Sequence, residues 1–479
     1  MNSVHTALLE TLRGIVGAPH VHTADTEDLI AYEQDWRKRV RGRALAVVLP
    51  ASTLEVAAVV RACVAAEVAV VPQGGNTGMV VGATPDTSGT QVVLRTTRMA
   101  AIRAIDAGNL TVTVEAGCVL QTLQDACAEA GFLFPLSLGS EGSCTIGGNL
   151  STNAGGTQVV RWGNTRELCL GLEVVTPQGE VWSNLTGLRK DNTGYDLRHL
   201  LIGAEGTLGI ITAATLKLSP LPAVQLTAFA AVYSLQSAVE LLTLAHRQLH
   251  AGLTGFEVMG RFALSLVQKH FPQQRIPFID TLDEAAAPYF VVLENSDAES
   301  ASHARERFEA LLGQAIDEGC VLDAVVAENV AQAHALWHIR ESIPLAQAAE
   351  GLNLKHDISL PISSIPEFVD EALPTLQAAC PGVRLVNYGH LGDGNLHFNV
   401  QAPVGANAEA FLRDMEAPIA HVVYELVKAR GGSISAEHGI GSLKREKLVE
   451  YKDPVMLSTM RAIKQALDPQ GLMNPGKMV

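Results

Sequence analysis

The sequence lacks several features that would assign it to a common class of protein. It has no CxxC pair, and its seven cysteines are spread from Cys63 to Cys380. A disulfide framework or a thiolate zinc site is therefore not expected, whereas reduced thiols in a cytoplasmic setting are. No uncharged apolar stretch reaches the roughly 18 residues of a membrane-spanning helix. The opening MNSVHTALLETLRG also lacks the basic and apolar regions of a secretory signal.

An excess of positive charge is also missing. The chain carries 35 Lys and Arg against 50 Asp and Glu, a formal net charge of −15. Broad nucleic-acid binding needs a basic face and is not expected, although a local cluster of cations can still bind a small acidic substrate. With 47% hydrophobic and 18% charged residues the composition is that of a globular protein, and 479 residues predict two or three domains.

Short β-like runs and amphipathic helical patterns alternate up to Pro220. Ser52 and Glu55 form a capping-box pattern before a helix. The patterns predict strands at 44–50, 68–73, 110–117 and 208–220, a helix at 120–130 and a hairpin at 170–182. After Pro222 they predict strands at 225–234, 253–258, 287–293 and 321–327, and helices at 235–249, 299–318 and 454–467. Such a mixture predicts a second, α+β domain built on an antiparallel sheet.

Two segments are rich in glycine. Pro72–Gly78 follows an apolar strand directly, and Leu138–Gly156 holds six glycines among small polar residues. Glycine lets the backbone approach an anion closely with its N–H groups turned inward, so a pyrophosphate is a natural ligand of two such loops. Each segment alone fits a tight turn equally well. Neither has the GK[ST] of a P-loop or the GxGxxG of a Rossmann unit, which disfavours an NTPase or a nicotinamide dehydrogenase.

With Arg161–Gly163 and Leu201–Gly209, these segments resemble the FAD-binding domain of the vanillyl-alcohol oxidase family, also called the PCMH-type FAD domain, over about residues 38–220. The resemblance implies that the first loop wraps the pyrophosphate. Several members attach FAD through a His at the position of Asn76, so non-covalent FAD is expected here. The residues expected to bind FAD are Pro72, Gly74, Gly75, Asn76, Thr77, Gly78, Ser137, Gly139, Gly142, Thr145, Gly148, Asn149, Gly155, Gly156, Gly163, Glu205, Gly206, Ile210 and Asn474, with Glu205 and Ile210 on the adenine side.

Two histidines flank a Gly-Asp-Gly turn near the C-terminus. His390 and His397 are seven residues apart, and the turn can bring them together; His397 and Asn399 then share one face of a strand. Two imidazoles and a carboxylate form a common divalent-metal site with room for substrate. The carboxylate candidate is Glu437, with His438 beside it. Asp393 is either an alternative ligand or the cap of its own turn.

GHxGDGNxH, SAEHGIG and the closing Asn474–Lys477 resemble the C-terminal domain of FAD-linked D-2-hydroxy acid dehydrogenases of the hydroxyglutarate and lactate type. Both resemblances together span about residues 34–479, and Asp35–Arg37 looks more like the hydroxyglutarate branch. By this resemblance a divalent metal, usually zinc, is held by His390, His397 and Glu437. Asn399 and His438 would contact the substrate, with His438 as the base.

Two cations complete the expected site. Arg340 lies on a predicted helix and offers a bidentate fork to a carboxylate, and Lys355, which precedes a predicted strand, offers a compact charge. Either would ordinarily be a solvated surface side chain, but both match substrate-carboxylate residues of the family. The hydroxyglutarate enzymes tend to have Thr four residues after this Arg, where Pro344 stands here. Recognition of a second, distal carboxylate is therefore an open question.

These features predict an α+β protein with a two-subdomain FAD-binding domain (1–220), an α+β substrate and metal cap domain with an antiparallel sheet (221–430), and a C-terminal segment that returns to the flavin and completes the active site (431–479). We expect FAD to oxidise a D-2-hydroxy acid to the 2-oxo acid. The chain has no haem motif or iron–sulfur cysteine set, so the electrons would pass to an external acceptor: electron-transferring flavoprotein, a quinone or a cytochrome. A homodimer is one option for the assembly.

Two other classes of function fit part of the pattern. A metal-dependent hydrolase would use the glycine loops for a phosphorylated substrate and would be colourless. A non-catalytic flavin-binding protein would be yellow but would keep its colour when a hydroxy acid is added. Bleaching of the flavin by a 2-hydroxy acid without oxygen separates the dehydrogenase from both.

Overall fold

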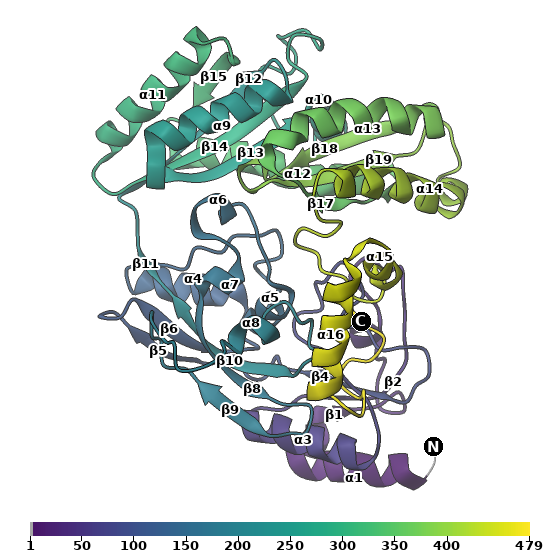
Figure 1. Ribbon diagram of the computed structural model, residues 1–479. Coiled ribbons are helices and arrows are strands. Elements are labelled where there is room, and N and C mark those ends of the chain that lie inside the picture. Colours follow the sequence, from purple (N-terminus) through teal and green to yellow (C-terminus); the bar gives the residue numbers. More distant parts are fainter. Residues whose placement is uncertain (1–2) are drawn as a thin grey trace. The chain divides into compact units, whose positions relative to one another are not determined.

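The computed structural model describes Ser3–Val479. Contacts divide it into two compact units, which are described separately (Figure 1). The first unit holds the residues up to Gly155 together with Gly163–Pro220 and Glu437–Val479. The second unit holds Gly156–Trp162 and Leu221–Ala436. Of the helices in the described residues, none has both the length and the apolar character needed to cross a bilayer.

The first unit contains two main sheets. A four-stranded sheet has the order β1 (Val21–His22), β2 (Ala44–Val48), β4 (Gln91–Arg95), β3 (Val70–Gln73), with β4 parallel to both β2 and β3. A five-stranded antiparallel sheet has the order β5 (Ile102–Asp106), β6 (Thr111–Glu115), β10 (Ile210–Lys217), β8 (Cys169–Val175), β9 (Val181–Asn184). The short strands β7 (Phe132–Leu133) and β11 (Ser219–Pro220) pair with each other. The predicted hairpin at 170–182 is thus confirmed as β8 and β9, and the predicted strand at 208–220 is shorter, ending before β11.

The helices of the first unit are mostly short. They are α1 (Ser3–Val16), α2 (Ile30–Glu33), α3 (Thr53–Ala65), α4 (Leu120–Glu129), α5 (Ile146–Thr152), α7 (Thr165–Leu168), α8 (Arg198–Leu201), α15 (Arg445–Tyr451) and α16 (Pro454–Leu467), with the 3₁₀ turn η1 (Ala18–His20). At the start of α3, Ser52 Oγ accepts a hydrogen bond from the N–H of Glu55 (3.2 Å), as the capping box predicts. The Glu55 carboxylate bonds the N–H of Ala51 (2.7 Å) rather than that of Ser52.

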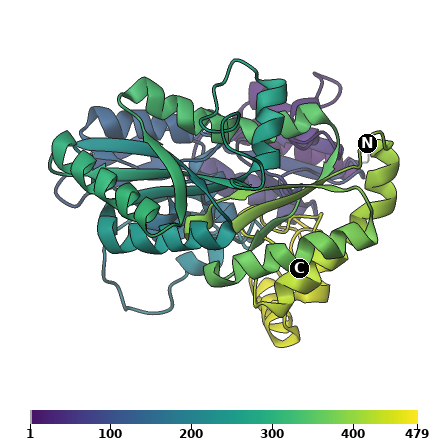
Figure 2. The same ribbon diagram turned by 90° about the horizontal axis from the view of Figure 1, so that it is seen from above.

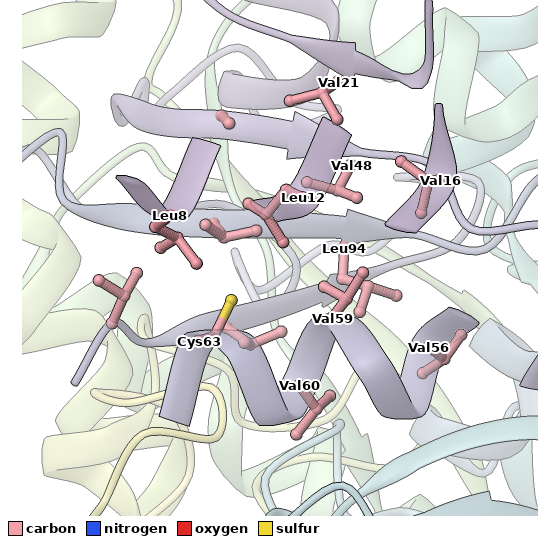
Figure 3. Close-up of a cluster of buried hydrophobic side chains, with 14 of the residues drawn as sticks. Leu8, Leu12, Val16, Val21, Val48, Val56, Val59, Val60, Cys63 and Leu94 are labelled. Atoms are coloured by element: carbon pink, nitrogen blue, oxygen red, sulfur yellow. The ribbon is translucent and has the colours of Figure 1, made fainter. Parts of the chain in front are cut away.

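A core of aliphatic side chains joins α1, α3 and the four-stranded sheet. Leu12 of α1, Val59 of α3 and Leu94 of β4 are completely buried in it (Figure 3). Each such side chain contributes about 1.5–3 kcal/mol relative to an exposed one. Met473 belongs to the same core, and Val70 of β3 donates to the carbonyl of Leu472 (2.9 Å). The C-terminal segment is therefore built into the N-terminal sheet.

The second unit is built on one antiparallel sheet. Its order is β15 (Val321–Val326), β12 (Val224–Val232), β14 (Tyr289–Asp297), β13 (Leu253–Gly260), β18 (Arg384–Gly389), β19 (Asn395–Gln401), β16 (Asn353–Leu354), and β17 (Asp357–Ser359) also pairs with β19. The helices are α6 (Val159–Trp162), α9 (Leu235–Leu249), α10 (Arg261–His270), α11 (Ala301–Asp317), α12 (Val330–Glu350), α13 (Ile365–Ala379) and α14 (Ala408–Ala429), with the 3₁₀ turns η2 (His250–Gly252), η3 (Ile362–Ser364) and η4 (Leu391–Asp393). Figure 2 shows helices along both faces of this sheet.

The sheet face covered by α10 and α12 has apolar side chains on some strands and polar side chains on others. Phe229, Phe290 and Met259 pack there against apolar side chains of the two helices, among them Ile339. Further along the same face, polar side chains replace apolar ones. Because strand residues alternate between faces, Glu257 shares the face of Met259, two positions away. This polar half of the face holds the residues described below.

Glu350, the last residue of α12, belongs to an ion cluster that we expect to stabilise the fold. The Glu350 carboxylate binds Lys269 Nζ (2.6 Å), Arg384 Nη1 (2.8 Å) and His270 Nε2 (2.9 Å). Hydrogen bonds from Lys269 and Arg384 are the largest causes that lower the pKa of Glu350 from 4.5 to about 2. We expect Glu350→Gln to lower the free energy of unfolding by about 1–2 kcal/mol, because each hydrogen bond to a charged group contributes modestly and solvent screens the cluster.

The pH dependence of stability provides a control for this prediction. Since the folded-state pKa lies below the unfolded value, the cluster stabilises fully above pH 4.5 and this contribution is lost as the pH falls through 2. Denaturant unfolding at neutral pH and at pH 3 should therefore give a smaller difference between the wild type and Glu350→Gln at the lower pH. Glu309→Gln, which breaks an exposed pair with Arg305, should change little. Equal stability of all three proteins at neutral pH would show that the cluster contributes nothing.

Candidate active site

The two glycine segments meet in the first unit. A Cβ on Gly74 would lie 2.3 Å from Thr145 Oγ1, and one on Gly75 would lie 2.1 Å from the carbonyl oxygen of Ser143. Only glycine allows backbones to approach this closely. The segments that the sequence predicts to bind one cofactor are thus packed against each other.

Asn76 has a left-handed backbone, with φ of 59°. Its side-chain nitrogen donates to the carbonyls of Gln34 (2.9 Å) and Ala31 (3.2 Å). The Asn76 amide therefore anchors the first glycine loop to the segment before β2. An amide is not a nucleophile toward flavin, which agrees with the prediction of a non-covalent cofactor.

Other parts of the two segments are open. Nothing lies within 4 Å of the Cβ position of Gly78, Gly139 or Gly142. The side-chain nitrogen of Asn149 is buried with no oxygen or nitrogen partner in the described part of the chain. Exposed glycine backbone and the buried side-chain donor of Asn149 both fit a cofactor with many oxygen acceptors such as FAD.

The remaining residues that the sequence predicts to bind FAD lie in several different elements. Gly163 (φ 74°) and Gly206 (φ 69°) lie in the left-handed region, and a Cβ there would meet Glu167 and Pro72 respectively. The others lie as follows: Pro72 on β3, Thr77 in the first loop, Ser137 just before the second segment, Gly148 on α5, Gly155 and Gly156 at the division between the units, and Ile210 buried at the start of β10. Their roles toward FAD stay predictions.

Glu205 links the FAD motif to the segment that carries Glu437 and His438. Both of its carboxylate oxygens accept backbone hydrogen bonds of 2.7 Å, from Ile440 and Gly441. Burial raises the pKa of Glu205, although these two N–H groups act in the opposite direction. Asn474 Nδ2 donates to the carbonyl of Glu205 (2.7 Å). Its carboxylate thus holds the C-terminal segment, and the predicted contact of Glu205 on the adenine side of FAD stays a prediction.

This arrangement predicts a local effect of Glu205→Gln. An amide offers one acceptor where the carboxylate offers two, so one of the N–H groups of Ile440 and Gly441 loses its partner. An unsatisfied buried N–H costs about 1–3 kcal/mol. Hydrogen exchange at the amide that loses its partner should become about 5- to 150-fold faster, while amides in β12 of the second unit should not change. Unchanged exchange at both amides would contradict the proposed link.

In the second unit, a hairpin brings His390 and His397 together, as the sequence predicts. His397 lies on β19 opposite Tyr388 of β18, and His390 directly follows β18. The two imidazole centroids are 5.4 Å apart, and the His397 ring lies 4.9 Å from that of Tyr388. The turn requires glycine, because Gly389 has φ of 153° and a Cβ there would lie 2.6 Å from the carbonyl of Asn395.

Asp357 supplies a carboxylate beside His397. It pairs with His397 in the register of β17 and β19, and its Oδ1 is 4.0 Å from His397 Nδ1. Asn395 donates to the same oxygen (2.9 Å). Asp357 and His397 belong to a group of side chains that could hold a metal ion. Carboxylate and imidazole donors fit a divalent cation such as zinc, so Asp357 is a candidate metal-site residue that no sequence motif indicates.

Glu437 and His438 belong to the first unit, directly after Ala436, the last residue of the second. Both are half-buried, and His438 Nε2 lies 3.8 Å from Glu437 Oε1. Asp393, the alternative ligand, accepts from the N–H of Asn395 through Oδ1 (3.1 Å). Asp393 therefore caps its own turn. Burial, its largest influence, raises its pKa to about 6.

Arg340 lies on α12 beneath the histidine pair and is buried. Its Nε donates to Glu257 Oε2 (2.8 Å), and its guanidinium lies 4.8 Å from the ring centroid of Tyr388. The other oxygen of Glu257 contacts His390 Nδ1 at 2.6 Å. Burial alone would raise the pKa of Glu257, but the charges of His390 and Arg340 outweigh it, and the pKa is lowered. An ionised carboxylate thus joins the predicted substrate anchor to a predicted metal ligand.

Asn399 is buried on the same face as His397. Its oxygen accepts from the N–H of His356 (3.1 Å), and its nitrogen donates to Gln347 Oε1 (3.0 Å). These bonds hold the segment between β16 and β17, which contains Lys355, a half-buried residue. The observed contacts of Asn399 support the segment next to Lys355, and its predicted contact with substrate stays a prediction.

Comparison with known protein families identifies the class of enzyme to which this chain belongs. The family of FAD-linked oxidases, C-terminal domain, matches residues 221–478, and the FAD binding domain family matches residues 44–183. The chain belongs to the FAD-linked oxidase family. It is an FAD-dependent oxidoreductase.

Individual relatives narrow the comparison. D-2-hydroxyglutarate dehydrogenase, mitochondrial, of Bos taurus is 38% identical over 459 residues, covering 95% of this chain and 80% of the relative. D-2-hydroxyglutarate dehydrogenase of Xanthomonas citri pv. viticola is 39% identical over 451 residues, covering 94% and 92%. The solved structure of p-cresol methylhydroxylase with substrate bound has a TM-score of 0.77 at 16% identity, covering 100% of this chain and 97% of that one. The predicted PCMH-type α+β fold is therefore confirmed.

Proposed function

We propose that this FAD-dependent dehydrogenase oxidises a D-2-hydroxy acid to the 2-oxo acid, with D-2-hydroxyglutarate as the first candidate substrate and D-lactate as the second. The observation that carries the proposal is the buried Arg340, fixed by Glu257 beside the pair His390 and His397. A desolvated guanidinium is a strong partner for a substrate carboxylate. The printed names of the relatives supply the D-2-hydroxyglutarate part.

The chain's own residues have distinct tasks in this reaction. Arg340 and Lys355 hold the substrate carboxylate and orient the C–H bond. His438 accepts the proton of the 2-hydroxyl as a general base, and Asn399 keeps Lys355 in place through its bond to the His356 backbone. Bound FAD supplies the acceptor for the hydride.

We infer a divalent cation, with zinc as the first candidate, held by His390, His397 and Glu437. The chemistry of two imidazoles with a carboxylate supports it, and Asp357 beside His397 adds a further negative charge. When bound, such a cation supplies a Lewis acid for the hydroxyl oxygen of the substrate.

The second carboxylate of a hydroxyglutarate substrate needs its own partner. Pro344 lies on α12, one turn after Arg340. It has no N–H and no side-chain donor, so it cannot act as the Thr of the hydroxyglutarate enzymes would. The ratio of kcat/KM for D-2-hydroxyglutarate to that for D-lactate therefore shows whether another residue of this chain binds the distal carboxylate.

The cofactor is proposed to be non-covalent, which makes a direct prediction. The side-chain amide of Asn76 donates hydrogen bonds to the carbonyls of Ala31 and Gln34, and it is not a nucleophile that could form a bond to the flavin. Acid precipitation should therefore release all the flavin into the supernatant. Flavin that stays with the precipitated chain would contradict this.

The setting of the enzyme is also a proposal. All seven cysteines are free, which supports a reducing, cytoplasmic compartment. The reduced flavin would pass its electrons to an external acceptor, namely electron-transferring flavoprotein, a quinone or a cytochrome. A homodimer is proposed for the assembly.

Single-turnover reduction of the flavin by a panel of 2-hydroxy acids tests the function without any assumption about the acceptor. D-2-hydroxyglutarate or D-lactate should bleach the flavin rapidly, and the L-enantiomers should not. If only hydroxy acids outside these two reduce the flavin, the substrate assignment is wrong. If none does, the proposed reaction is wrong.

A further inference from the structure

Glu257 is a fully buried carboxylate on β13 (Leu253–Gly260), a strand in which Thr254 is the other polar side chain. Its side chain has 0% exposure. An ionised carboxylate without partners would be strongly unfavourable at such a position. Its two oxygens are taken by two different residues, His390 and Arg340, which come from distant parts of the sequence.

The partners of Glu257 determine where the hydrogen of His390 lies. Arginine only donates, and an ionised carboxylate only accepts. At 2.6 Å from Glu257 Oε1, His390 Nδ1 must therefore carry a hydrogen. In the neutral ring the lone pair is then on Nε2, the atom with which His390 would bind a cation.

We propose that Glu257 is a positioning residue that sets the substrate anchor and a metal ligand together: one carboxylate fixes the guanidinium of Arg340 and the tautomer of His390. The roles of these two partners rest on the proposed function. Glu257 itself acts only through them.

The variant Glu257→Gln tests this with little change in size. Because Arg340 can only donate, the amide oxygen must face Arg340, and the amide NH₂ must face His390. His390 can accept from this NH₂ only by moving its own hydrogen to Nε2. That tautomer has no lone pair left for a cation.

Glu294 provides a matched control. It lies on the neighbouring strand β14, opposite Gly255 of β13, and is also buried. Its hydrogen-bond partners include the neutral side chains Thr254 (2.7 Å) and Gln225 (3.5 Å). Glu294→Gln makes the same chemical change on the same sheet.

The experiment measures zinc affinity by competition with a chromogenic chelator, and 2-oxoglutarate binding from the flavin difference spectrum. In the FAD-loaded enzyme we expect Glu257→Gln to bind zinc about 10- to 100-fold more weakly, the usual loss when a residue that supports a metal ligand is changed. Binding of 2-oxoglutarate should weaken as well, and the flavin spectrum of the ligand-free variant should equal that of the ligand-free wild type. Glu294→Gln should match the wild type in both measurements.

The outcomes separate this inference from the proposed function. Wild-type affinities in a folded Glu257→Gln overturn the inference, as does equal weakening in Glu294→Gln, which would indicate a general loss of packing. If Glu257→Gln does not fold, Glu257→Asp retains the charge but is too short to hold both partners. It should show zinc affinity below that of the wild type, and wild-type affinity overturns the inference. A wild type that reduces its flavin with a hydroxy acid but binds no zinc retains the oxidation and contradicts the metal-ligand part.

Discussion

Replacing His390 with alanine is expected to remove the bound cation and abolish turnover while FAD stays bound. In the proposed site His390 would offer its Nε2 to the cation, because Glu257 Oε1 lies 2.6 Å from its Nδ1. Loss of a ligand should weaken zinc binding by more than the roughly 10- to 100-fold that loss of a supporting residue costs. The fold should survive, because Glu257 keeps its partner Arg340 (2.8 Å). Metal content of the purified protein, the flavin spectrum and single-turnover flavin reduction measure the three effects.

The matched control for this prediction is His334→Ala. His334 lies on α12 and is exposed. It should keep the metal content and turnover of the wild type. Full activity with a normal rate of flavin reduction in His390→Ala would remove the cation from the account.

Replacing Arg340 with lysine is expected to lower kcat/KM for the hydroxy acid by about 10²–10³-fold. Truncating one partner of a buried, hydrogen-bonded charge pair costs about 2–5 kcal/mol, and lysine cannot reproduce the planar fork that addresses a carboxylate and Glu257 together. Lysine is preferred to alanine because it keeps a positive charge beside the buried Glu257, whose ionised carboxylate would otherwise have His390 alone left of these two partners. Steady-state kinetics and 2-oxoglutarate binding measure the change, which should raise KM as well as lower kcat.

Arg384→Lys is the control for Arg340→Lys. Arg384 is half-buried, and it binds Glu350 rather than Glu257. Its substitution should leave KM unchanged. If Arg340→Lys behaves like Arg384→Lys, the substrate carboxylate has another anchor.

The sequence predicts most accurately those helices whose hydrophobic pattern and end signals both lie within one short segment. The helices at 235–249 and 454–467 are found at these bounds as α9 and α16. The closeness of His390 and His397 was also predictable, because a short glycine turn between two strand-like runs leaves few alternatives. Family resemblance supplied the FAD fold, which neither glycine segment establishes alone.

Contacts between residues far apart in the chain could not be predicted. Glu257 and His390 are 133 positions apart, and no local pattern encodes the strand order that places β13 beside β18. A signal was nevertheless present in the sequence, because the carboxylate of Glu257 is flanked by the apolar residues Phe256, Val258 and Met259, and a carboxylate buried among them must have partners. The same limit explains why α6 was not recognised as part of the second unit.

Glu205 shows how a correct motif can hide a different contact. The motif Leu201–Gly209 indicates an FAD domain, and the FAD binding domain family matches residues 44–183, which precede the motif. The carboxylate of Glu205 nevertheless binds the N–H groups of Ile440 and Gly441, more than 230 positions later. Such a contact depends on how the C-terminal segment returns to the first unit, which the motif does not contain.

The oxidation of a D-2-hydroxy acid by bound FAD is tested by mixing the purified protein with D-2-hydroxyglutarate in the absence of oxygen. We expect the flavin to become fully reduced in a single turnover, with one 2-oxoglutarate formed for each flavin reduced. L-2-hydroxyglutarate should leave the flavin oxidised. A flavin that remains oxidised with D-2-hydroxyglutarate, with D-lactate and with every other 2-hydroxy acid in the panel would show that the protein does not catalyse this reaction.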